Sequence, residues 1–221
     1  MNIKAFALFK KDFHSELRTR YAVNALIMFI IVAISVILFS IGNEKISQSL
    51  TGGLLWVVIF FSAMSGLSRA FVSEEERGTT MTLQLIASPS TVFSGKLLFN
   101  LILVFVMNIV IALLYSAMFD AFVIKNFLLF LVTFLLGNIG LAISSTIIAA
   151  IIAKAGSKGT LYPVLSFPIL LPLILLLVHL TLNSLDGTSF DQSLFELAMV
   201  ACYDVIMLSA SYMLFDFVWK D

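Results

Sequence analysis

Six long stretches of the chain are almost continuously apolar, and the polar residues gather between them. Crossing the hydrocarbon core of a membrane takes about 20 mostly apolar residues in a helix. The pattern therefore predicts an all-α integral membrane protein with six transmembrane helices. The predicted spans are Tyr21–Ile41, Thr51–Ser68, Leu97–Phe119, Phe127–Ala153, Leu161–Leu182 and Leu194–Phe215.

The segment before the first span has the periodicity of an amphipathic helix. Ile3, Phe6, Phe9, Phe13 and Leu17 fall on one face, and mostly charged or polar residues fall on the other. Such a helix is suited to lie in the membrane interface, and we predict this for residues 1–20. A basic tail that only sets the topology is the alternative, and the two are compatible.

Composition agrees with a membrane protein. Of the 221 residues, 61% are hydrophobic and 12% charged, and 13 Lys and Arg balance 13 Asp and Glu, which disfavours a nucleic-acid binder. Eleven of the 13 basic residues lie on one side of the predicted spans. Because Lys and Arg concentrate in cytoplasmic loops, both termini are predicted to be cytoplasmic. We expect a single transmembrane domain over residues 1–221, in which residues 69–96 form the longest cytoplasmic segment.

This cytoplasmic segment has signals of local structure. Ser73 and Glu76 match a capping box, which predicts a short helix start. Gly78, Ser88 and Pro89 are expected to break or end helices, which leaves Met81–Ile86 as a short amphipathic piece.

Two spans contain unusual residues that need a structural reason. The fourth span is rich in Gly, Ala and Ser, which favours close helix packing, most simply within the chain. The fifth carries Pro163, Pro168 and Pro172, which predict a kink. His179, near the outer end of that span, could ligate haem iron, but a packing or interface role is favoured.

Asp204 is the one acid near the predicted membrane midplane. Ionisable side chains at that depth are costly and usually face the interior of a helix bundle. A structural hydrogen bond to a Ser, Asn or backbone group, or a contact with another subunit, is favoured over a proton relay, because the spans hold no further deep charges.

Catalytic motifs are missing from the sequence. It has no G-x-x-x-x-G-K-[ST] phosphate loop, no H-E-x-x-H and no G-x-S-x-G, and its single Cys202 excludes a multi-cysteine metal site. We therefore expect a subunit that is not an enzyme, binds no cofactor directly and holds no metal.

Several motifs resemble those of ABC-2-type exporter permeases and, more narrowly, the haem exporter protein B family (CcmB). The matching motifs are Glu75-Glu76-Arg77-Gly78-Thr79, Leu83 and Leu85, Ser88-Pro89, Gly95-Lys96, Gly66-Leu67-Ser68-Arg69-Ala70-Phe71, Tyr203-Asp204-Val205 and Phe215-Asp216-Phe217. The resemblance implies a permease subunit in the bacterial inner membrane that takes part in haem delivery for cytochrome c maturation. It also implies a separate ATPase subunit that hydrolyses ATP, other membrane subunits, a haem chaperone and two permease copies. Haem is then the candidate substrate, and the step is either its transport or release of the loaded chaperone.

Because the resemblance implies a separate ATPase subunit, we predict that residues 73–89 are the element on which this subunit docks. Charged contacts are assigned to Glu74, Glu75, Glu76 and Arg77, apolar contacts to Leu83, Leu85 and Ile86, and the breaks to Gly78 and Pro89. Arg69 is predicted to cap the second span and to pair with one of the three glutamates. The alternatives are a solvated charge run, an exporter of lipid-linked glycan or drug, and an ion-coupled carrier that uses Asp204.

Overall fold

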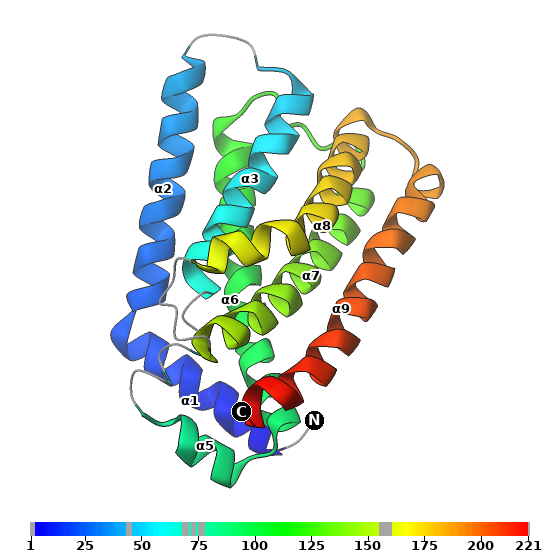
Figure 1. The fold of residues 1–221 in the computed structure, drawn as a ribbon. Coiled ribbons are helices and arrows are strands. Elements are labelled where there is room, and N and C mark those ends of the chain that lie inside the picture. Colours follow the sequence, from blue (N-terminus) through cyan, green and yellow to red (C-terminus); the bar gives the residue numbers. More distant parts are fainter. Residues whose placement is uncertain are drawn as a thin grey trace.

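The computed structural model describes residues 3–42, 46–67, 71, 74, 78–154 and 161–220. Helices make up nearly all of this part of the chain and it contains no strand, which confirms the all-α prediction. Most of the helices run alongside one another as a bundle (Figure 1). They are α1 (Ile3–Thr19), α2 (Tyr21–Ile41), α3 (Gln48–Leu67), α5 (Thr80–Ile86), α6 (Pro89–Met118), α7 (Phe127–Lys154), α8 (Leu161–Asp186), the 3₁₀ turn η1 (Phe190–Ser193) and α9 (Leu194–Lys220).

Five helical segments of the described chain are long and apolar enough to cross a membrane, so the protein is a multi-pass membrane protein. These segments are Gln48–Leu67, Pro89–Met118, Phe127–Lys154, Val164–Asp186 and Phe190–Trp219. The first predicted span does form a helix, α2, but its apolar run among the described residues is the shorter Leu26–Ile41. Six spans therefore remain a prediction.

Two helices extend beyond their predicted spans. Helix α6 begins at Pro89, about two turns before the predicted start at Leu97, because Pro89 occupies the first turn and Ser88 precedes it in an extended conformation. Helix α9 continues past Phe215 to Lys220. Both extensions are more polar than the spans, so a hydropathy pattern alone did not include them.

Helix α7 lies at the centre of the bundle and packs against α3, α6, α8 and α9 (Figure 1). Its small residues make this possible. A Cβ atom at Gly137 would lie 2.6 Å from the ring of Trp56 and 2.9 Å from Leu177, so a larger residue would push the neighbouring helices away. The predicted intrachain packing of the fourth span is confirmed.

Buried amides connect α6 and α7. Asn100 donates to the hydroxyl of Thr146 at 2.8 Å, and Asn108 donates to the amide oxygen of Asn138 at 2.8 Å. All four residues are buried, and in an apolar environment such pairs contribute about 0.6–2 kcal/mol each to helix association.

Helix α8 contains Pro168 and Pro172 in its interior and changes direction along its length (Figure 1). A proline removes one backbone donor and its ring crowds the preceding turn, which accounts for the bend. The kink predicted for the fifth span is confirmed.

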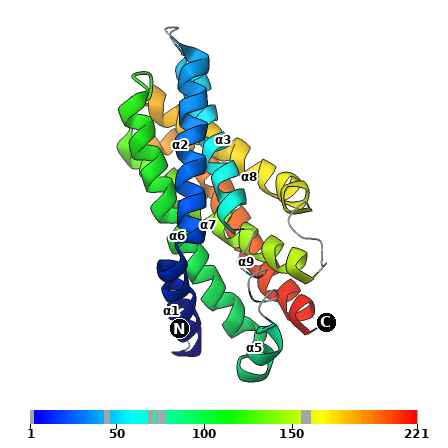
Figure 2. The ribbon, with the colours of Figure 1, turned by 90° about the vertical axis from the view of Figure 1, so that its left-hand side faces the viewer.

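Both termini and α5 lie at the same end of the bundle, whereas the C-terminal ends of α2, α6 and α8 lie at the other (Figures 1 and 2). Helix α1 turns away from α2 at Arg20, which has a left-handed backbone with φ of 51°. It then packs against the start of α6. A Cβ atom at Gly95 would lie 2.9 Å from the Ala5 carbonyl oxygen, so glycine is needed for this close approach.

Candidate functional site

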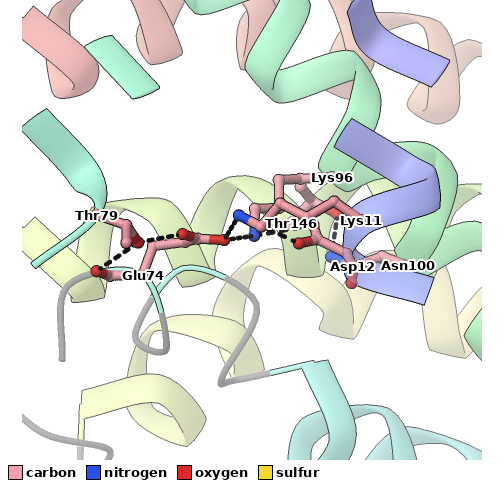
Figure 3. Close-up of polar contacts among 7 residues, drawn as sticks. All are labelled: Lys11, Asp12, Glu74, Thr79, Lys96, Asn100 and Thr146. Atoms are coloured by element: carbon pink, nitrogen blue, oxygen red, sulfur yellow. Dashed lines mark hydrogen bonds and ion pairs between the residues drawn. The ribbon is translucent and has the colours of Figure 1, made fainter. Parts of the chain in front are cut away.

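Four charged side chains from three segments meet where α1 packs against α6 (Figure 3). Lys96 of α6 is the centre, with its Nζ 2.9 Å from Glu74 Oε1 and 2.9 Å from Asp12 Oδ2. Lys11 adds a second cation at 2.6 Å from the same Glu74 oxygen. We call Lys11, Asp12, Glu74 and Lys96 the ionic cluster. It joins α1, α6 and the segment between α3 and α5.

The ionic cluster is largely removed from solvent. The side chains of Lys96, Glu74 and Asp12 are 3%, 7% and 10% exposed, whereas that of Lys11 is 44% exposed. Burial by itself raises the pKa of Glu74, but the charge of Lys96 and hydrogen bonds from Lys11, Thr79 and Lys96 outweigh it and lower this pKa from 4.5 to about 2. Glu74 is therefore ionised at neutral pH, and its charge is balanced by two ammonium groups.

An aromatic group supports the ionic cluster from the side of α9. The ring of Phe71 lies 5.7 Å from Lys96 Nζ, and it packs in turn against Phe215 and Trp219. Phe93 of α6 contacts Phe215 as well. Phe71 thus lies between Lys96 of the ionic cluster and the end of α9.

Glu74 also fixes the start of α5. The hydroxyl of Thr79 donates to the Glu74 carboxylate, and the amide of Thr79 donates to the Glu74 carbonyl at 3.0 Å. Gly78 before it has a φ of +64°, a conformation that suits glycine. Movement of α5 would therefore pull on the Glu74 carboxylate and, through it, on Lys96.

Helix α5 projects at the end of the bundle and exposes apolar residues. Met81, Leu85 and Ile86 are 76%, 89% and 62% exposed, whereas Leu83 packs against the core. Residues near both ends of the chain hold this helix in place. Gln84 donates to the Trp219 carbonyl, and Lys4 donates to the Ile86 carbonyl at 3.4 Å. The predicted amphipathic piece Met81–Ile86 is confirmed as a helix, with its apolar side turned outward at Leu85.

The structure places the predicted residues of the segment differently. Glu74 faces inward, so its carboxylate serves the ionic cluster and is not an exposed contact as the sequence suggested. Pro89 begins α6 and does not merely end α5. Outside the described residues lie Arg69, Glu75, Glu76 and Arg77, and with them the capping box and the predicted ion pair of Arg69.

Asp204 lies in α9 where that helix meets α7 and α8. It is 6% exposed, and its Oδ1 occupies the space that a Cβ atom of Gly140 would need. Neither carboxylate oxygen has a hydrogen-bond partner among the described residues. The bundle-facing position is as predicted, but the favoured hydrogen bond to a Ser, Asn or backbone group is not present in this part of the chain.

His179 lies at the other end of the bundle. Its Nδ1 is 3.0 Å from Glu196 Oε1, and Asn183 donates to the other Glu196 oxygen at 3.1 Å. These contacts join α8 to α9, in keeping with the favoured packing role.

Glu74 will make the stability of the protein depend on pH in the acid range. Its folded-state pKa is below the unfolded value of 4.5, so the stabilisation is complete above pH 4.5 and is lost as the pH falls towards about 2. The shift corresponds to about 3 kcal/mol. Thermal unfolding of detergent-solubilised protein at a series of pH values measures this contribution of Glu74 to stability. Glu74→Gln is the control, which is expected to lack the dependence on pH. Equal acid sensitivity of both proteins would contradict the predicted role of the Glu74 carboxylate.

The ionic cluster was not predicted from the sequence. Glu74 was assigned to an exposed contact, Lys96 was noted only as part of the Gly95-Lys96 motif, and Lys11 and Asp12 were not singled out. The one usable signal was Lys96 itself, a lysine that immediately precedes a long apolar run and is followed by no nearby acid in the sequence.

A comparison with family models places nearly the whole chain in one family. The model described as CcmB protein matches residues 3–212, which include α1, the ionic cluster, α5 and most of α9. No curated protein matches the chain.

Proposed function

The chain belongs to the CcmB family, the haem exporter protein B family, and on this basis we propose that it is the membrane permease subunit of an ABC transporter complex acting in haem delivery for cytochrome c maturation. The observation that carries the proposal is the family match over residues 3–212, which covers the bundle and the projecting α5 together. Five long apolar helices support the membrane location.

We assign ATP hydrolysis to a separate subunit. The sequence has no phosphate-binding loop, so the chain itself is proposed to be non-catalytic and to hold no cofactor. The other members of the complex are further cytochrome c maturation subunits and a haem chaperone. Two permease copies are proposed, because one bundle of this size is small for a complete translocation path.

The orientation follows from the charges. With the basic residues facing the cytoplasm, α1, α5 and both termini lie on the cytoplasmic side of the inner membrane. Helix α1 then lies in the interface, α2 completes six spans, and residues 69–96 are the cytoplasmic coupling segment of a single transmembrane domain.

In this orientation α5 meets the ATPase. Its exposed Met81, Leu85 and Ile86 supply an apolar contact, which is the usual energetic centre of an interface. Force applied to α5 passes through Thr79 to Glu74 and then through Lys96 to α6 and α1. The step that it drives is either transport of haem or release of the haem-loaded chaperone.

Co-purification tests the ATPase assignment. Full-length permease in mild detergent is expected to recover the ATPase subunit. The double variant Glu75→Lys/Glu76→Lys is expected to recover several-fold less, because it reverses the charge of the sequence just before α5 while the protein still inserts. Lys10→Glu, a charge reversal at an exposed position of α1, is the control. Full recovery by the double variant would argue against a charged docking contact there.

A further inference from the structure

Asp204 is enclosed by three helices of the bundle. Its own helix α9 packs against α7 and α8, and the carboxylate rests on Gly140 of α7 and near Leu173 of α8. A Cβ atom at Gly140 would meet the side chains of both Asp204 and Leu173. Only 6% of Asp204 is exposed. The glycine thus provides the space that the carboxyl group fills.

Polar groups near Asp204 are engaged elsewhere. The hydroxyl of Tyr203 donates to the Ile169 carbonyl at 2.9 Å and lies 3.1 Å from the Ser144 hydroxyl. Both Asp204 oxygens are left without a hydrogen bond among the described residues. The carboxyl group is therefore both dry and unpartnered in this packing.

Charged groups do not compensate for this. The described part of the chain contains no ion pair to Asp204. The only charged residue of α7 is Lys154 at its far end, about 20 Å from Gly140 along the helix. The titratable residues of α8 are Tyr162, which is buried against Ser145, His179, which pairs with Glu196, and the terminal Asp186.

An ionised carboxylate in such a site is very costly. Without a cation or hydrogen-bond donors, removal of the charge from water costs far more than protonation, so the group becomes neutral. A neutral carboxylic acid fits the site without that cost.

We propose that Asp204 is a proton-binding site inside the membrane, and that the proton is bound whenever α9 is packed on Gly140. Binding joins one proton from water to the carboxylate, and release requires that α9 separate from α7 so that water reaches the oxygens. Separation of these helices and release of a proton are then one event. This goes beyond the permease assignment and does not depend on the ATPase.

Infrared spectroscopy of the full chain in lipid nanodiscs at neutral pH tests the proposal. A neutral carboxylic acid has a carbonyl stretching band that a carboxylate lacks, and an ordinary aspartate is ionised at this pH. We expect such a band in the unmodified protein, and we expect it to shift when the aspartates are labelled with carbon-13 at the side-chain carboxyl.

Three variants assign the band. Asp204→Asn is expected to lose it completely, whereas Asp216→Asn, at an exposed position of the same helix, is expected to keep it. Asp204→Glu retains an acid and is expected to keep a band that no longer responds to labelled aspartate, which covers the case that the Asn variant does not fold. Absence of the band from the unmodified protein, or its persistence in Asp204→Asn, would overturn the proposal.

Discussion

Replacing Lys96 with methionine will lower the free energy of unfolding by about 3–5 kcal/mol, because the change leaves two buried carboxylates with only one cation. Among the described residues, Lys96 is the buried side chain that contacts both Asp12 and Glu74. Methionine keeps its approximate length and removes its charge. Lys11 still reaches Glu74, so the loss is expected towards the lower part of this range. The same change uncouples α5 from α6.

Thermal or denaturant unfolding in detergent measures this effect. Lys10→Met is the matched control, because Lys10 is an exposed lysine of α1 outside the ionic cluster, and its stability is expected to change little. Adding Glu74→Gln to Lys96→Met should recover part of the loss, since the unpaired charge at Glu74 is then removed. A Lys96→Met protein as stable as the Lys10→Met control would contradict the structural role of the ionic cluster.

Replacing Leu85 with aspartate will weaken binding of the ATPase subunit by about 30-fold, which corresponds to about 2 kcal/mol for a central apolar contact. Leu85 is 89% exposed on α5, so the substitution should leave the stability of the bundle unchanged. A charge at this position would have to be desolvated in the interface, which adds to the lost apolar contact.

Binding of purified ATPase to the immobilised permease measures this difference. Ser90→Asp introduces the same charge at an exposed position just beyond α5 and is expected to bind nearly as well as the unmodified protein. Equal binding by the Leu85 and Ser90 variants would place the docking surface elsewhere.

Much of the bundle could be predicted because the sequence signals are local. Continuous apolar runs fixed the positions of the long helices, and the concentration of Gly, Ala and Ser in α7 correctly indicated the helix that packs against most others. The prolines of α8 likewise act within one turn of their own position. Such features depend on a few neighbouring residues.

The ionic cluster could not be predicted in the same way. Its members come from positions 11, 12, 74 and 96, and their proximity depends on how α1 folds back at Arg20 and approaches Gly95. That close approach is a tertiary contact, so Glu74 looked like one member of an exposed run of acids. Nothing in the run itself distinguishes the residue that turns inward.

Asp204 illustrates a different limit. Its position in the middle of a long apolar run was evident from the sequence, and the predicted position facing the bundle interior was correct. The expected hydrogen-bond partner was inferred from the cost of leaving a polar group unsatisfied. The packing of Asp204 against Gly140 could not be predicted from the sequence. Gly140 leaves a space that accepts the carboxyl group without providing a hydrogen-bond donor.

Deletion of the gene, followed by haem staining of c-type cytochromes, tests whether this chain is the permease of a cytochrome c maturation system. Covalently haem-bound c-type cytochromes are expected to disappear, and the unmodified chain is expected to restore them. Recovery should be reduced with Leu85→Asp, in line with its weaker binding of the ATPase. Unchanged c-type cytochromes in the deletion strain would contradict a role of this chain in cytochrome c maturation.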